Sequence, residues 1–488
     1  MGPIPFDNSY TRLPGAFYTR QEPTQVHRPG AIRVNHALAR QLGIDPDWLD
    51  SAEGIATIAG NHVPEGAEPL AAVYAGHQFG SYNPQLGDGR ALLLGEVLDR
   101  NGQRFDIQLK GSGPTPYSRG GDGRSPLGPV LREYIVSEAM AALGVPTTRA
   151  LAAVSTGEPV IRDRALPGAV LARVASSHIR IGTFQYFSAV GDHASLRLLV
   201  EHSLARHYPE FAGAESPALA LLQCVVDAQA ALVPRWQALG FIHGVMNTDN
   251  MLVCGETIDY GPCAFIDDFH ADKVFSSIDR GGRYAYRNQP GIAQWNLACL
   301  AHALLPVIDA DQDRAVELAQ AAVDTYPDKF LAAQSRCMAD KLGLDRLEGD
   351  DKALVDALFA NLDTHGTDFT LAFRRLYELA GGEPAVGELF EFPAAFAPWL
   401  AQWRARLAAD SLTPEQRLAV MRRANPVFIP RNHLVEAAIR AAEDRGDLQP
   451  FHALVERTAR PFDFDPDDRP YATPPRPEQV VERTFCGT

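Results

Sequence analysis

The stretch from His243 to Asn250 reads HGVMNTDN, and Asp259-Tyr260-Gly261 follows nine residues after Asn250. Amide and carboxylate oxygens are the ligands that Mg²⁺ and Mn²⁺ prefer, so Asn250 and Asp259 are the candidate metal ligands. Asp249 is the candidate to accept a proton from a hydroxyl group. The alternative is structural: Asn250 and Asp259 would satisfy turns, and Asp249 would cap a helix or turn. The segment therefore predicts a metal site beside a proton-accepting carboxylate.

The spacing of this segment resembles the catalytic loop of the protein-kinase fold. Kinases carry H-R-D-x-x-x-x-N followed by D-F-G, and small-molecule kinases of the same fold carry H-G-D-x-x-x-x-N. His243, Gly244 and Asn250 fall in register, but Val245 stands where a kinase has its catalytic aspartate. The resemblance implies either a kinase without its base or an enzyme that performs different chemistry on ATP.

A lysine upstream is expected to reach bound phosphates. The apolar pattern predicts strands over 91–97 and over 104–110, and the second strand ends at Lys110. A helix is expected from Pro129 to Leu143, where Gly144 and Pro146 end it. Of its acids, Glu133 is the predicted partner of Lys110, because it lies in the first turns. A surface lysine and an ordinary helix acid are the alternative.

Glycine-rich turns flank this lysine on both sides. Gly87-Asp-Gly-Arg90 precedes the first strand, and Gly120-Gly-Asp-Gly-Arg124 follows the second. Glycines let the backbone approach a phosphate closely, and the neighbouring arginines add positive charge. Neither turn is G-x-G-x-x-G, and a single turn of this kind is usually only a turn. Two of them around one lysine favour a nucleotide site.

Arg173 and Arg180 lie in an otherwise apolar stretch, VLARVASSHIRIGTF, at 170–184. Arginines on a buried side need anionic partners. They are therefore either structural ion pairs or clamps on phosphate, and a clamp of this kind contributes about 10³ to 10⁵ in rate.

The pattern along the chain predicts an α+β protein with a kinase-like bilobal fold. We expect an N-terminal extension over 1–65 that wraps the core and has one helical stretch at 34–42. An N-lobe over 66–165, a mostly helical C-lobe over 166–460 and a Pro-rich tail over 461–488 follow. A helix over 216–240 leads into the catalytic segment, and a β-hairpin over 251–265 would bring Asn250 and Asp259 together. Thr413-Pro-Glu-Gln416 predicts a capping box.

Composition excludes several classes of protein. The net charge of −15 and the pI of about 5.4 argue against a nucleic-acid partner. No apolar run is expected to span a membrane, because Gln223, Asp227 and Gln229 interrupt the most apolar stretch. The N-terminus lacks the pattern of a signal peptide, so a cytoplasmic location is expected. The six cysteines form no CxxC pair; five are expected to be buried thiols, and Cys486 lies in the tail.

Taken together, these segments resemble the selenoprotein O family of protein adenylyltransferases, also called YdiU. The strings that carry the resemblance are long: YAGHQFGSYNPQLGDGRALLLGE at 74–96, IQLKGSGPTPYSRGGDGRSPLGPVLREY at 107–134, HGVMNTDNM at 243–251, IDYGP at 258–262 and NPVFIPRNH at 425–433. The resemblance implies a kinase-like fold that binds ATP in a flipped orientation. AMP, rather than phosphate, would then be transferred to a Ser, Thr or Tyr hydroxyl of a protein.

The resemblance also implies a role for each candidate residue. Asp249 would be the base, Asn250 and Asp259 would hold Mg²⁺ or Mn²⁺, and Glu133 would pair with Lys110. The residues expected at the nucleotide are Gly87, Gly89, Arg90, Lys110, Asp122, Gly123, Arg173, Arg180 and Asp259. Transfer of UMP with Mn²⁺, γ-phosphate transfer, and nucleotide binding without catalysis are the alternatives.

One departure from the family concerns redox regulation. Family members often carry Cys or selenocysteine near the C-terminus, and Cys486 matches it. Some also have a cysteine after the metal-binding region, but 273–277 here reads KVFSS. An internal regulatory disulfide is therefore not expected, and Cys486 would need a partner thiol elsewhere.

Overall fold

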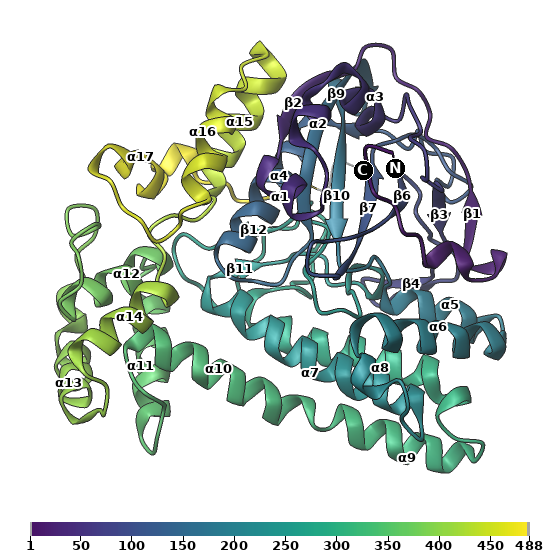
Figure 1. Ribbon diagram of the computed structural model, residues 1–488. Coiled ribbons are helices and arrows are strands. Elements are labelled where there is room, and N and C mark those ends of the chain that lie inside the picture. The colour runs from purple at the N-terminus through teal and green to yellow at the C-terminus, as the bar shows by residue number, and fades with distance from the viewer. Residues whose placement is uncertain (1, 486–488) are drawn as a thin grey trace.

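The computed structural model describes residues 2–485 of the 488-residue chain, so Cys486 lies outside the described residues. An antiparallel sheet of eight strands forms one half of the molecule (Figure 1). Its order is β1-β3-β6-β7-β10-β9-β2, and β8 pairs with β10. The strands are β1 (Tyr18–Arg20), β2 (Gly30–Val34), β3 (Leu70–Ala72), β6 (Ala91–Leu98), β7 (Arg104–Lys110), β8 (Ser125–Pro126), β9 (Arg149–Ile161) and β10 (Ala165–Ala175). The two predicted strands, β6 and β7, are confirmed.

The first 60 residues contribute to both edges of this sheet. Strand β1 forms one edge beside β3, and β2 forms the other edge beside β9. Three helices follow β2, whereas the sequence predicted only one helical stretch: α1 (His36–Gln41), α2 (Pro46–Asp50) and α3 (Ala52–Ala59). The prediction missed α2 and α3, which have five and eight residues. Their starts are nevertheless marked by the capping side chains of Asp45 and Ser51.

Helix α4 (Leu127–Ala142) covers one face of the sheet and carries Glu133. It packs against β9 and β10. The prediction of a helix over 129–143 is confirmed to within two residues. Two late helices, α15 (Asn432–Arg445) and α16 (Gln449–Thr458), pack against α4 (Figure 1). The Gly128 N–H donates to Glu443 Oε1 at 3.1 Å, and Arg132 Nη2 lies 3.5 Å from Glu436 Oε2.

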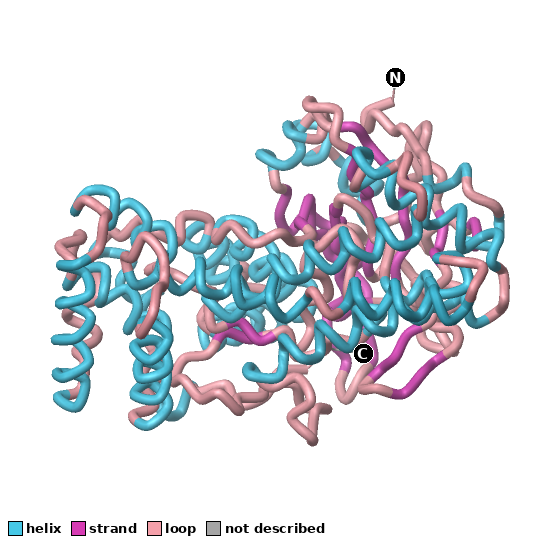
Figure 2. Tube along the Cα trace, turned by 90° about the horizontal axis from the view of Figure 1, so that it is seen from below, coloured by secondary structure: helices cyan, strands magenta, loops and turns pink. Residues whose placement is uncertain are grey.

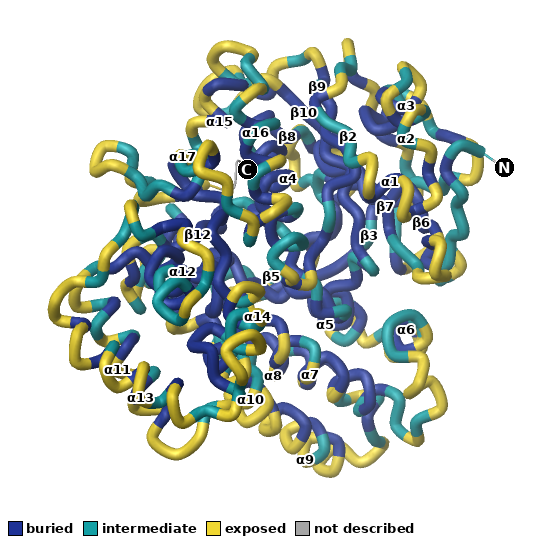
Figure 3. Tube along the Cα trace, turned by 60° about the vertical axis from the view of Figure 1, so that its left-hand side comes forward, coloured by how far each residue is buried: buried dark blue, intermediate teal, exposed yellow. Residues whose placement is uncertain are grey.

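The remainder of the chain is mainly helical, and its long helices lie side by side when seen from below (Figure 2). The helices are α5 (Ile181–Ala189), α6 (His193–His207), α7 (Pro217–Ala238), α8 (Gln289–Ile308), α9 (Gln312–Val323), α10 (Tyr326–Leu342), α11 (Asp351–Thr364), α12 (Phe369–Leu379), α13 (Ala397–Ala409), α14 (Pro414–Ala424) and α17 (Arg469–Ala472). The Thr413 capping box at the start of α14 is confirmed. Figure 3 shows the central strands as buried, whereas α11 and α13 are exposed along one side. The protein is thus mixed α/β with a helical C-terminal region.

The expectation that no segment could span a membrane needs correction. By length and composition alone, α7 and residues Tyr286–Ile308 are long and apolar enough to cross a membrane. Each has a mean hydropathy of 1.4. Within these windows 67% of the first and 44% of the second is buried inside the protein. Because α7 packs against α8, α9 and α10, its apolar character is accounted for by its place in the core.

The predicted hairpin over 251–265 is wrong. Short strands β11 (Phe241–Ile242) and β12 (Ala264–Phe265) pair with each other, and the residues between them form an irregular loop. Within this loop, Leu252 bridges to Arg180 and Thr257 bridges to Thr147. Gly255 has a φ of 76° and Asp259 a φ of 64°, which interrupts regular strand pairing. Leu252 and Thr257 therefore pair with neighbouring elements rather than across a hairpin.

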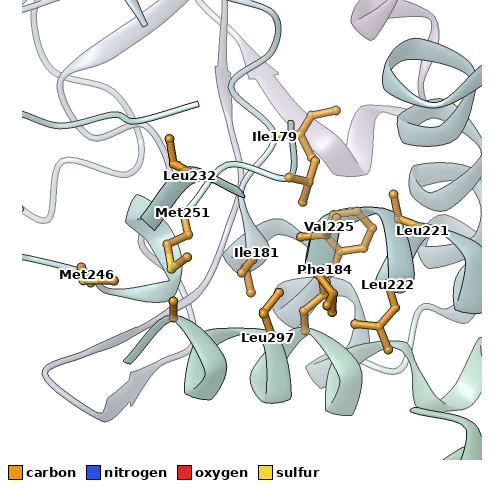
Figure 4. Close-up of a cluster of buried hydrophobic side chains, with 14 of the residues drawn as sticks. Ile179, Ile181, Phe184, Leu221, Leu222, Val225, Leu232, Met246, Met251 and Leu297 are labelled. Carbon is orange, nitrogen blue, oxygen red and sulfur yellow. The ribbon is translucent and has the colours of Figure 1, made fainter. Parts of the chain in front are cut away.

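Apolar side chains of this loop anchor it in the hydrophobic core. Met246 and Met251, on either side of Asp249, lie in the buried core with Ile181, Phe184 and Leu297 (Figure 4). Met246 is 1% exposed and Met251 is 2% exposed. The loop is therefore fixed by burial of its own apolar residues, while its polar residues remain available above the core.

The last described residues return to the loop. Thr484 accepts a hydrogen bond from the Ser277 N–H at 3.0 Å, and its own N–H donates to the Phe275 carbonyl at 2.8 Å. The Thr484 hydroxyl donates to the Pro262 carbonyl at 2.5 Å. Described residues of the tail are thus fastened to the segment that follows Asp259.

Candidate active site

A cavity of about 750 Å³ lies between the sheet and the loop that joins β11 to β12. Nearly all the predicted site residues line it: Gly87, Gly89, Arg90, Lys110, Asp122, Gly123, Arg173, Arg180, Asp249, Asn250 and Asp259. Glu133 is not part of the lining and contacts the cavity through Lys110. Predicted site residues as far as 172 residues apart in sequence, Gly87 and Asp259, therefore meet in one place.

Five charged side chains form a buried network at the floor of the cavity. Lys110 Nζ lies 2.5 Å from Glu133 Oε2 and 3.2 Å from Asp259 Oδ1. Arg173 donates from Nε to Glu133 Oε1 at 2.7 Å and from Nη2 to Asp259 Oδ1 at 2.7 Å. Arg180 Nη1 lies 3.0 Å from Asp259 Oδ2. Three cations and two carboxylates leave a net positive charge, which suits an anionic ligand.

The network keeps its carboxylates ionised. Burial opposes ionisation of Asp259, but Arg173, Lys110 and Arg180 together lower its pKa well below the usual value. Burial likewise opposes ionisation of Glu133, and its pKa is lowered by Arg173 and Lys110. For Lys110, burial and the nearby Arg173 lower the pKa of the ammonium group. Asp259 is consequently a permanent anion at the centre of the site.

The backbone around Asp259 is held by His243. The His243 ring lies 2.8 Å through Nε2 from the Ile258 carbonyl, and Nδ1 accepts the Val245 N–H at 3.3 Å. These partners assign the proton to Nε2, and burial lowers the pKa of His243, so the ring is neutral. A neutral histidine thus connects the His243–Asn250 segment to Ile258. The next residue, Asp259, has a left-handed φ of 64°, which is costly for a non-glycine residue.

Asp249 differs from Asp259 in its surroundings. Its side chain has no ion-pair partner among the described residues, and the buried Oδ1 atom has no hydrogen-bond partner there. Oδ2 lies 3.5 Å from Gln78 Nε2. Burial raises the pKa of Asp249 to about 6, against the opposing influence of Arg180. A buried carboxylate of raised basicity with an unused oxygen is suited to accept a proton.

A short hairpin that the sequence did not predict donates hydrogen bonds to the His243–Asn250 segment. Strands β4 (Gly76–Gln78) and β5 (Ser81–Asn83) pair with each other outside the main sheet. The His77 N–H donates to Thr248 Oγ1 at 2.7 Å, and the Phe79 N–H donates to Asn247 Oδ1 at 3.0 Å. A Cβ atom at Gly76 would lie 2.6 Å from Asp249 Oδ1, so a larger residue would displace that carboxylate.

The oxygen atoms of the site fit a divalent ion. Asn250 donates from Nδ2 to the Val245 carbonyl at 2.9 Å, which leaves its Oδ1 atom as an acceptor. Asp259 supplies carboxylate oxygens in the same cavity. Residues 2–485 contain no group of three or more His, Cys, Asp or Glu arranged to hold a metal. A hard ion such as Mg²⁺ or Mn²⁺ needs few protein ligands when phosphate oxygens complete its coordination.

Four further arginines line the cavity. Arg90 was predicted for the site and Arg124 belongs to the second glycine turn, whereas Arg119 and Arg162 were not proposed. Arg162 pairs with Asp122 at 2.8 Å, and this pair links the second glycine turn to the sheet. The glycine turns were the only sequence signal for these arginines, and Arg162 lies outside them in a separate turn between β9 and β10. Positive charge is thus concentrated around the cavity of an acidic protein.

Replacement of Asp249 by asparagine is expected to stabilise the fold near neutral pH. Because burial raises the pKa of Asp249 to about 6, the native state binds this proton more tightly than the unfolded state does. Ionisation of Asp249 lowers the free energy of unfolding. This loss is absent below about pH 4 and fully present above about pH 6, where it is on the order of 2 to 3 kcal/mol. Thermal unfolding should therefore show a higher Tm for the variant at about pH 8 and equal values at about pH 4. Equal Tm values at both would contradict the burial argument.

Comparisons with known proteins identify the family. The model of the family described as "Protein adenylyltransferase SelO" matches residues 3–459. A relative from Rhizobium johnstonii, named "Protein nucleotidyltransferase YdiU", is 57% identical over 488 residues, covering 99% of this chain and 97% of the relative. A relative of the same name from Rhodopseudomonas palustris is 56% identical over 488 residues, covering 99% of both chains. The chain therefore belongs to the SelO family, a family of protein nucleotidyltransferases.

Proposed function

We propose that this protein transfers AMP from ATP to Ser, Thr or Tyr hydroxyls of proteins and releases pyrophosphate. The observation that carries the proposal is the position of the basic carboxylate. Asp249, with its raised pKa and unused Oδ1, shares a cavity with Lys110 and Asp259, whereas the apolar Val245 stands at the position of the kinase base. The site therefore has a proton acceptor, but not where γ-phosphate transfer in kinases uses one.

In the proposed reaction, one bond to the α-phosphorus forms while another breaks, and residues of the site accept the proton and stabilise the charge. Asp249 takes the proton of the acceptor hydroxyl as its oxygen attacks the α-phosphorus of ATP. The bond between the α-phosphorus and the bridging oxygen breaks, and pyrophosphate leaves with the bond electrons. Lys110, Arg173 and Arg180 stabilise the negative charge on the phosphates. A divalent ion held by Asn250 and Asp259, Mg²⁺ or Mn²⁺, would supply further charge neutralisation when bound.

We further infer that the sheet and the helical region correspond to the two lobes of a kinase-like fold. The ion pair between Lys110 on β7 and Glu133 on α4 supports this inference, because kinases position a lysine and a helix acid in the same way. The glycine turns with Gly87, Gly89, Asp122 and Gly123 would then approach the nucleotide closely.

Incubation with ATP labelled separately at the α and γ positions tests the proposed reaction. We expect label from the α position, and none from the γ position, to enter protein in the presence of Mg²⁺ or Mn²⁺. Label entering only from the γ position would indicate a phosphotransferase, and binding without product would indicate a scaffold. Substitution of UTP for ATP with Mn²⁺ would measure transfer of UMP in the same assay.

The rate of transfer is expected to depend on the ionisation of Asp249. Because the pKa of Asp249 is raised to about 6, kcat/KM should be constant above about pH 7 and fall about tenfold per pH unit below about pH 6. The sign follows from the role: only the ionised carboxylate accepts a proton. The residual transfer of an Asp249→Asn variant should lack this dependence. A wild-type profile without a break between about pH 5 and 7 would contradict the assignment of the base.

A further inference from the structure

A second group of polar and aromatic side chains lies beside the catalytic segment, around Arg283. The Arg283 guanidinium carbon lies 4.7 Å from the ring centre of Trp295 and 5.8 Å from that of Tyr284. His77 extends the group, because its ring centre lies 5.2 Å from Trp295 and 4.9 Å from Tyr82. We call these five residues the Arg283 site. Three separate segments of the chain build it, namely the β4–β5 hairpin, residues 283–284 and helix α8.

The guanidinium of this site lacks an anionic partner among the described residues. Its Nε and Nη2 atoms are buried and donate no hydrogen bond to the described part of the chain. The nearby Asp279 carboxylate forms no ion pair with the guanidinium. It accepts hydrogen bonds from the main-chain N–H groups of Arg283 at 2.9 Å and of Tyr284 at 2.8 Å. By contrast, Arg287 on the same segment pairs with Asp272 at 2.7 Å. A half-buried cation that is held by aromatic rings and a hydrogen bond with Tyr284, without a carboxylate partner, is suited to bind an anionic group.

The β4–β5 hairpin sets the distance between this guanidinium and Asp249. At its start, a Cβ atom on Gly76 would lie 2.6 Å from Asp249 Oδ1. At its turn, a Cβ atom on Gly80 would lie 3.6 Å from Arg283 Cζ. Gly76 to Gln78 is extended and advances about 3.3 Å per residue, and the turn at Phe79 and Gly80 adds to this length, so the two groups lie on the order of 10 Å apart. A hydroxyl at Asp249 and a residue about three positions away in an extended acceptor would match this separation.

The surroundings of the site fit a protein segment. Tyr82 is 41% exposed on the hairpin, and Ile278, which lines the cavity, is 59% exposed. Phe79 packs against Tyr284 at 5.1 Å between ring centres, and the Tyr284 hydroxyl donates to Asn247 at 2.6 Å. These contacts connect the Arg283 site directly to the catalytic segment. An acceptor bound here would thus be aligned with the proton-accepting carboxylate.

We propose that Arg283 binds the carboxylate of an Asp or Glu residue that lies about three positions from the modified hydroxyl in the acceptor protein. This inference rests on the proposed transfer of AMP to proteins and adds the class of acceptor sequence to it. Because Nε and Nη2 are buried, Nη1 is the guanidinium nitrogen that would donate to the carboxylate, while the Trp295 ring centre lies 4.7 Å from the guanidinium carbon. Tyr82 and Ile278 contact the apolar parts of the same acceptor segment.

Mapping of modified sites by mass spectrometry tests this proposal. Wild type, Arg283→Gln, Arg283→Glu and the matched control Arg287→Gln are incubated with ATP, Mg²⁺ and a whole-cell lysate, and AMP-bearing residues are located. For wild type and the control, we expect Asp and Glu to be enriched about threefold or more at one position about three residues from the hydroxyl. Arg283→Gln should lose the enrichment, and Arg283→Glu should replace it with enrichment of Lys and Arg. An unfolded variant could not produce that reversal.

The outcomes separate this inference from the proposed function. If wild type adds no AMP to any protein, the transferase proposal fails and the inference falls with it. If wild type adds AMP without enrichment of acids, or if Arg283→Gln keeps the wild-type pattern, only the inference is overturned. For a single acceptor with an acid at this position, Arg283→Gln should raise KM about tenfold and leave kcat within about twofold. A purely structural role would lower kcat and Tm for all acceptors alike.

Discussion

An Asp259→Asn variant is expected to lose at least about 10³-fold in AMP transfer. Asparagine retains the shape of the side chain but removes the anionic ligand for the metal. It also leaves Lys110 and Arg173 with Glu133 as their only carboxylate partner in the network, and Arg180 with none there. Those cations would then attract the phosphates without the balancing ion, and the α-phosphorus would no longer be held for attack. Transfer of α-label at saturating ATP measures the effect.

Asp267→Asn is the matched control for this substitution. Asp267 also pairs with a buried arginine, Arg431, at 2.7 Å, but it does not line the cavity. It should therefore lower the Tm by a few degrees, as the loss of an ion pair with a buried group does, while kcat falls less than about threefold. Retention of more than about a tenth of wild-type transfer by Asp259→Asn, with Mg²⁺ or Mn²⁺, would remove Asp259 from the metal site.

An Asp249→Asn variant should lose about 10² to 10⁴-fold in kcat, the usual contribution of a general base. The substitution removes the proton acceptor but preserves the size of the side chain, so the packing against Gly76 and Gln78 is kept. ATP binding is the internal control, because Asp249 makes no ion pair with the cationic network, and its dissociation constant should change less than about threefold. A kcat within about tenfold of wild type would exclude Asp249 as the base.

This loss of rate is expected together with a gain in stability. The same burial that raises the pKa of Asp249 makes the ionised form unfavourable in the folded protein. A variant that is both slower and more stable near neutral pH would show that the carboxylate serves activity and lowers the stability of the fold. A slower and less stable variant would instead indicate a structural role.

The local patterns in the sequence predicted most of the candidate site. His243, Asn250 and Asp259 lie close together in the chain, so their spacing alone defined the catalytic segment. The pairing of Lys110 with Glu133 could also be anticipated, because a strand that ends at a lysine and the first turns of the next helix are neighbours in such folds. The contact is present at 2.5 Å, although the functional roles of the residues remain predictions.

Contacts between distant segments could not be predicted in the same way. Gln78 and Asp249 are 171 residues apart, and nothing local to either residue indicates that they meet. The hairpin predicted over 251–265 failed for a related reason. Leu252 and Thr257 bridge to Arg180 and Thr147 on other elements, and these tertiary contacts determined the backbone instead of the alternating pattern.

Packing of α15 and α16 against α4 has a consequence for biosynthesis. Gly128 and Arg132, on the helix that carries Glu133, bond to residues 315 and 304 positions later in the chain. A ribosome releases residues at about 5 to 20 per second, so α4 waits tens of seconds for these partners during translation. The helix that carries Glu133 thus gains these packing partners only near the end of synthesis.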